Sequence, residues 1–175
     1  MPTSRELRAR IGELPRRARS FQVWRAVRPA YELLGTHGAR LHGGRWNPPG
    51  LPVLYASLEP ATVRAEWVRA TERQGLPESA AYPLRLGLIA VRARTIDLRR
   101  AGALDSLGVD EPPSVLTPLG ETRAVGAAAA RNGVGALLVP SVTGVGANLV
   151  IVPDNLDAPP EVLEATLLRG PRAWP

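Results

Sequence analysis

The segment 43–50, Gly-Gly-Arg-Trp-Asn-Pro-Pro-Gly, carries the residue best suited to binding an anion. Its two leading glycines permit a close backbone approach or a positive φ angle. The planar guanidinium of Arg45 presents a fork that matches a phosphate or a carboxylate, and Trp46 can pack beneath the loop and fix it. A turn stiffened by proline and glycine, with Arg45 in solvent, fits the same residues. The pattern leaves both interpretations open.

Tyr55 and Glu66 could also act on a bound ligand. Alternation in the segment 54–57 places Tyr55 on the less apolar face of a strand. Its ring can stack on a ligand there or its hydroxyl can donate, although an ordinary surface tyrosine fits too. Glu66 lies on a predicted helix that also carries Arg69. Its carboxylate either pairs with Arg69 in solvent or points into a cleft and stabilises positive charge developing on a ribose.

Ser141 and Asn148 flank a glycine-containing turn between two apolar segments. Each can contact a ligand or simply terminate a turn. The two histidines, His37 and His42, are distant in sequence from Ser141, so a Ser/His/Asp hydrolase has little support. These histidines also lack a clear third ligand, and the sequence predicts no metal site.

The composition excludes several classes of function. There is no cysteine, which rules out disulfides and thiolate chemistry and agrees with a cytoplasmic protein. The net charge is +6, but the arginines that supply it are scattered and aromatic residues are few, so we do not expect direct nucleic-acid binding. A phosphate-bearing small molecule or an acidic protein partner fits this charge. No apolar run reaches membrane-spanning length, and we expect no membrane association.

The elements that must position these residues alternate irregularly between helices and strands. Periodicity and breakers predict helices at 4–14 (capped by Ser4), 59–73, 121–131 and 159–168, strands at 21–27, 52–57, 84–91, 95–98, 134–139 and 148–152, and irregular segments at 35–50 and 102–118. No Gly-x-Gly-x-x-Gly follows a strand, so a Rossmann site is unsupported.

Taken in order, these segments resemble the RES domain, which is named for its Arg, Glu and Ser. The matching pieces are Trp-Arg-Ala-Val at 24–27, Gly-Ala-Arg at 38–40, Gly-Gly-Arg-Trp-Asn at 43–47, Pro-Val-Leu-Tyr-Ala-Ser at 52–57, the Glu66 helix, Ala-Val-Gly at 124–126, Gly-Ala-Leu-Leu-Val-Pro-Ser at 135–141 and Asn-Leu-Val-Ile at 148–151. The likeness covers roughly residues 21–153, and the Gly-Gly-Arg-Trp-Asn piece is its most specific part.

The resemblance implies an α+β fold with an ADP-ribosyltransferase-like split mixed β core flanked by helices. We expect a single domain over residues 1–175, with its core at about 21–153. It also implies a cytoplasmic toxin that degrades NAD⁺, its substrate, by cleaving the nicotinamide–ribose bond through hydrolysis or phosphorolysis, without a metal. The expected partner is an Xre-type helix-turn-helix antitoxin, with a homo-oligomer of the toxin as one arrangement of their complex.

The resemblance also assigns roles to residues. The expected catalytic residues are Glu66, Tyr55, Arg25 and Ser141, and the expected substrate-binding residues are Arg45, Trp46, Asn47, Thr122 and Asn148. Ser141 is the choice for the serine of the family, with Thr122 as the alternative hydroxyl.

Two other functions fit the same sequence. The first is transfer of ADP-ribose to a protein or nucleic acid, which uses the same pocket and differs only in the acceptor. The second is a non-enzymatic module whose basic surface binds a partner. Loss of NAD⁺ and the fate of its ribosyl group distinguish the three functions.

Overall fold

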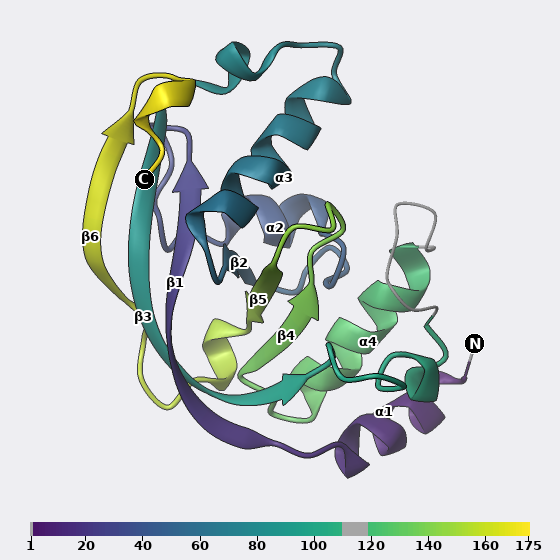
Figure 1. Cartoon of the computed structure of the whole chain (residues 1–175). Coiled ribbons are helices and arrows are strands. Elements are labelled where there is room, and N and C mark those ends of the chain that lie inside the picture. The colour runs from purple at the N-terminus through teal and green to yellow at the C-terminus, as the bar shows by residue number, and fades with distance from the viewer. Residues whose placement is uncertain (1, 110–118) are drawn as a thin grey trace.

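The structure is a computed structural model that describes residues 2–109 and 119–175, and it mixes helices and strands along the chain (Figure 1). Its helices are α1 (Ser4–Glu13), α2 (His37–His42), α3 (Pro60–Glu72) and α4 (Leu119–Arg131), its strands are β1 (Arg17–Val27), β2 (Leu54–Ser57), β3 (Leu84–Asp97), β4 (Ala136–Pro140), β5 (Ala147–Ile151) and β6 (Glu161–Leu168), and short 3₁₀ turns lie at Glu78–Ala81, Asp105–Leu107, Pro153–Asn155 and Pro171–Ala173. The predicted α+β class is confirmed.

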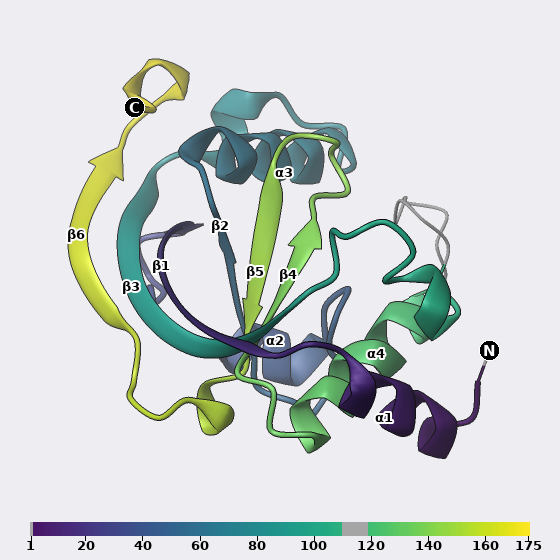
Figure 2. The same cartoon turned by 60° about the horizontal axis from the view of Figure 1, so that its bottom comes forward.

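The β core consists of two halves that meet at their ends. Strands β6, β3 and β1 pair antiparallel and curve side by side around one half, and β2, β5 and β4 pair antiparallel in the other (Figure 2). One junction is the short parallel pairing of β3 with β4. The other is the single β1–β2 pair between Trp24 and Ser57. The core is thus mixed and split, as predicted, and the β1–β3 pairing closes it.

Strand β3 is longer than the sequence patterns predicted. We expected two strands, at 84–91 and 95–98, because Arg92 and Arg94 interrupt the apolar run. The structure has one strand in which these exposed arginines alternate with buried Val91, Ala93 and Thr95. Alternation of this kind is typical of a strand with one buried face. This strand pairs with the whole of β1, from Arg85 to Thr95.

Three other local predictions were wrong. The helix predicted at 159–168 is strand β6, because pairing with the edge of β3 overrides the local preference of a segment rich in Glu, Leu and Ala. The segment predicted as a loop at 35–50 contains the short helix α2. Thr3 rather than Ser4 caps α1, and it forms a capping box with Glu6.

Helices α1 and α4 cover one side of the core. Leu7 and Ile11 of α1 are fully buried in a cluster that includes Val125 of α4 and Val150 of β5. Trp46 belongs to the same cluster and is 3% exposed. The loop that carries Arg45 is therefore anchored in the core through the neighbouring side chain, as the sequence suggested.

Helix α4 and this loop are in backbone contact at Gly126. A Cβ atom at that position would overlap the carbonyl group of Trp46, so only glycine allows the helix to lie this close. We therefore predict that Gly126→Ala lowers the free energy of unfolding by about 3 kcal/mol, as overpacking a rigid contact does. Urea denaturation measures this loss.

Gly120→Ala in the same helix is the matched control. Among the described residues, no atom outside the adjacent residues and the helix backbone lies within 4 Å of a Cβ placed there. Alanine also has the higher helix propensity, so this variant should be at least as stable as the wild type. Equal stability of the two variants would contradict the close contact at Gly126.

Candidate active site

A cavity of about 320 Å³ opens where β1 and β2 separate. After the Trp24–Ser57 pair the two strands no longer pair, although Arg25 and Ala26 of β1 and Tyr55 of β2 still line the same space. Helix α3 and the turn after β4 complete the wall. The split in the core thus becomes a pocket.

Four residues that the sequence singled out line this cavity together. Arg25 comes from β1, Arg45 from the loop after α2, Tyr55 from β2 and Glu66 from α3. Two of the expected substrate-binding residues, Trp46 and Asn148, also line it. Two guanidinium groups, a phenol ring and a carboxylate therefore share one small space.

The carboxylate of Glu66 is held through one of its oxygens. Ser141 Oγ donates to Glu66 Oε1 at 2.6 Å, and Asn148 Nδ2 donates to the same atom at 3.0 Å. Asn148 Oδ1 in turn accepts from Ser57 Oγ at 2.7 Å, which fixes the orientation of the amide. One interpretation of the sequence paired Glu66 with Arg69 in solvent. In the structure Arg69 instead donates to the carbonyl oxygen of Val142.

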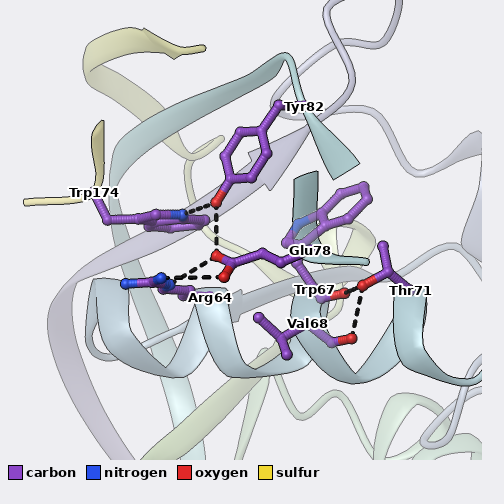
Figure 3. A network of polar contacts seen from close by, with 7 residues as sticks. All are labelled: Arg64, Trp67, Val68, Thr71, Glu78, Tyr82 and Trp174. Carbon is purple, nitrogen blue, oxygen red and sulfur yellow. Dashed lines mark hydrogen bonds and ion pairs between the residues drawn. The ribbon is translucent and has the colours of Figure 1, made fainter. Parts of the chain in front are cut away.

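Helix α3 is fixed from its other side by a polar network (Figure 3). Arg64 binds both carboxylate oxygens of Glu78, at 2.9 and 3.1 Å. Tyr82 donates to Glu78 Oε1 at 2.9 Å, and Trp174 donates to the Tyr82 hydroxyl at 2.5 Å. The helix that carries Glu66 is thereby tied to the turn after it and to the C-terminal segment.

The hydroxyl of Tyr55 is committed to the loop rather than to a ligand. It accepts from the backbone N–H of Trp46 at 2.9 Å and donates to Asn47 Oδ1 at 2.8 Å. Burial raises the pKa of Tyr55 to about 12, so the hydroxyl keeps its proton at neutral pH. The ring is the part of this residue that is left to contact a ligand.

Gly44 is required by this contact. A Cβ atom there would lie 2.5 Å from the Tyr55 hydroxyl and 2.8 Å from Asn47 Oδ1. The second glycine of the Gly-Gly-Arg-Trp-Asn segment therefore lets the backbone approach the tyrosine closely.

Arg25 is a buried cation with spare hydrogen-bonding capacity. Its Nη2 donates to the carbonyl oxygen of Gly35 at 2.9 Å. Its Nη1 is buried and has no hydrogen-bond partner among the described residues. Burial lowers the pKa of Arg25 to about 10, and burial followed by repulsion from Arg69 lowers the pKa of Arg45. An anionic ligand would compensate for the burial of both cations.

Three expected site residues lie outside the cavity lining and form hydrogen bonds to the segments that line it. Thr122 is fully buried and donates to the backbone oxygen of Arg45 at 2.5 Å. Asn47 is also fully buried, and its amide donates to Ala39, Pro48 and Leu51 carbonyl oxygens. Neither of these two residues lines the cavity, so their expected role in substrate binding stays a prediction. Ser141 likewise lies outside the lining and orients Glu66.

A family comparison identifies the domain that carries this cavity. The model of the RES domain matches residues 22–170. The chain belongs to the RES family. The predicted resemblance is confirmed, and the match extends beyond residue 153 to include β6.

A solved structure resembles this RES protein over almost its whole length. It is a chain of the crystal structure of the M. tuberculosis MbcT–MbcA toxin–antitoxin complex, with a TM-score of 0.84 and 24% sequence identity. The similarity covers 96% of this chain and 93% of that one, and it shows a shared fold. No sequence among the curated proteins matches this chain.

Within residues 2–109 and 119–175, no helix is both long and apolar enough to cross a membrane. In the same part of the chain, no three His, Cys, Asp or Glu side chains gather as ligands for a metal ion.

Sequence analysis missed two tryptophans of this RES protein that line the cavity, Trp24 and Trp67. The available signal was their position, since Trp24 precedes Arg25 and Trp67 follows Glu66 in a chain with only four tryptophans. They add aromatic surface to that of Tyr55.

We predict that Tyr55→Phe lowers the free energy of unfolding by about 1–3 kcal/mol at pH 8, because a buried N–H and a buried amide oxygen lose their partner. The difference in the free energy of unfolding between this variant and the wild type should narrow between pH 10 and 12. In that range the unfolded wild-type chain loses the Tyr55 proton more readily than the folded one, so wild-type stability falls as pH rises. Phenylalanine has no such proton. Urea denaturation at pH 8 and pH 11.5 measures both effects, and a constant difference would contradict the raised pKa.

Proposed function

We propose that this RES protein is a toxin that degrades NAD⁺ by breaking the bond between nicotinamide and ribose. One observation carries the proposal: a single cavity is lined by an oriented carboxylate, two partly or largely buried guanidinium groups and aromatic rings. Membership of the RES family and the fold shared with a chain of a toxin–antitoxin complex support it.

Glu66 stabilises the charge that the reaction creates. As the C1′–N bond breaks, its electron pair moves to the nicotinamide nitrogen, which becomes neutral, and the ribose gains oxocarbenium character. A carboxylate held at a fixed orientation favours this transition state. Ser141 and Asn148 supply that orientation and need no rearrangement as charge develops.

Arg25 and Arg45 hold the pyrophosphate and so position the ribose. Guanidinium groups bind phosphate oxygens through paired hydrogen bonds, and the buried Nη1 of Arg25 has no hydrogen-bond partner among residues 2–109 and 119–175. Fixing the phosphate end places the reacting carbon relative to Glu66. The rings of Tyr55 and of the two tryptophans offer flat apolar surface for nicotinamide.

Water or phosphate completes the reaction from the open side of the ribose. Attack by a water oxygen on C1′, with loss of one proton, yields ADP-ribose and nicotinamide. Attack by a phosphate oxygen yields the 1-phosphate of ADP-ribose instead. NAD⁺ with a labelled ADP-ribose portion reports the acceptor, because either small product supports degradation and a labelled macromolecule supports transfer.

We predict that Glu66→Gln reduces kcat/KM for NAD⁺ by at least about 100-fold, the usual cost of removing a fixed charge-stabilising group. The amide oxygen of glutamine can still accept from Ser141 and Asn148, so the melting temperature should stay close to that of wild type. Loss of NAD⁺ is measured on purified protein with and without phosphate.

Glu72→Gln is the matched control, since Glu72 lies on the same helix and is exposed at its end. This variant should keep wild-type activity. Near-normal turnover by folded Glu66→Gln protein would contradict the proposed role of the carboxylate.

A toxin of this kind needs an inhibitor in its own cell, and we propose an Xre-type helix-turn-helix antitoxin that covers the cavity. The similar chain comes from a complex with an antitoxin, and the charge of +6 suits an acidic segment. A helix-turn-helix protein encoded beside this gene should abolish NAD⁺ loss at equimolar amounts, and a non-cognate one should not. Stable binding without inhibition would contradict coverage of the cavity.

A further inference from the structure

A second hollow, of about 890 Å³, adjoins the candidate active site. It is formed by the segment between β1 and α2, by α2 itself and by Trp67 of α3. Arg25, Ala26 and Trp67 line both spaces, so the two hollows share a wall. Nothing in the proposed chemistry at Glu66 uses the second hollow.

The first cavity is small for the whole of the proposed substrate. Its volume of about 320 Å³ lies at the lower end of ligand pockets, which run from roughly 300 to 1,000 Å³. A dinucleotide consists of two nucleotides joined through a pyrophosphate. If the nicotinamide end lies beside Glu66, the other nucleotide must extend beyond this cavity.

Arg25 marks the passage between the two hollows. Arg25 lines both, and its buried Nη1 has no hydrogen-bond partner among the described residues. A buried donor without an acceptor is costly, and a phosphate oxygen would satisfy it. The pyrophosphate of a bound dinucleotide would then sit at the junction, with one nucleotide on each side.

The second hollow offers an aromatic ring and a carboxylate beside basic side chains. Tyr31 lies on its wall with 64% of its surface exposed. Glu32 lines it together with Arg25, Arg28 and two histidines, and Arg28 lies over the Trp67 ring at 6.0 Å. An exposed ring can stack on a base, and a carboxylate can accept from ribose hydroxyls.

We propose that this second hollow binds the adenosine end of NAD⁺ and that the ring of Tyr31 stacks on the adenine. The inference rests on the proposed function, because it assumes that NAD⁺ is the substrate. Contacts in the second hollow would add to the affinity for NAD⁺. The protein would therefore bind NAD⁺ more tightly than nicotinamide mononucleotide, which lacks the adenosine half.

The experiment uses the Glu66→Gln protein, in which substrate should bind without being consumed. Calorimetry gives the Kd of NAD⁺ and of nicotinamide mononucleotide, with and without the additional change Tyr31→Ala. Loss of one base-stacking contact should raise the Kd of NAD⁺ about tenfold and change the Kd of the mononucleotide less than twofold. Tyr31→Phe keeps the ring and should retain the Kd of NAD⁺.

Two measurements keep the failures separate. If wild-type protein does not consume NAD⁺, the proposed function is wrong. If wild-type protein consumes NAD⁺ but Tyr31→Ala leaves its Kd unchanged, or weakens both ligands equally, the adenosine site is wrong and the function stands. The circular dichroism spectrum of each variant should match that of wild type, because Tyr31 is largely exposed.

Discussion

The separation of β1 from β2 after one residue pair is the constraint on which the candidate site depends. Continued pairing of these strands would bring Arg25 and Ala26 of β1 against Ala56 and Tyr55 of β2 and would close the space between them. Strand β1 pairs with β3 along its whole length instead, and β2 pairs with β5. The backbone groups are thus satisfied on the outer sides of the gap, which keeps the gap available for side chains.

A rigid loop opposite this gap supplies the second arginine. Its backbone is held by Tyr55, Thr122 and Arg123 and lies against Gly126 of α4. The three hydrogen bonds are all to backbone atoms of the loop. The loop therefore fixes where the Arg45 side chain begins, an arrangement that reduces the entropy lost when a ligand binds.

Sequence reasoning was most accurate where a pattern is local. Alternation predicted β1, a short apolar run predicted β2, and a helical segment ended by glycine predicted α3, each within a few residues. It failed for β6, whose pairing with β3 joins segments distant in sequence. The meeting of Arg25 and Glu66 in one cavity came from family resemblance, since spacing could not show which way Glu66 points.

The roles of the polar residues were harder to predict than their positions. An amide such as Asn47 can bind a ligand or the backbone of its own loop, and residue type does not distinguish these uses. In the structure Asn47 serves the loop, whereas Asn148 holds Glu66 and lines the cavity. No local pattern in the sequence marked Tyr31 as a ligand-binding residue, because only the folded chain shows that its ring remains exposed beside a hollow.

Strand β6 has a consequence for solubility. It ends the strand order of the sheet in the described part of the chain, and seven of its eight residues are exposed. An exposed strand edge invites the strands of other molecules and promotes aggregation. Glu161 and Glu164 place negative charges along this edge, and an irregularity in its pairing with β3 falls at Leu88 and Ile89. Charge and distortion of this kind oppose edge-to-edge pairing between copies of the chain.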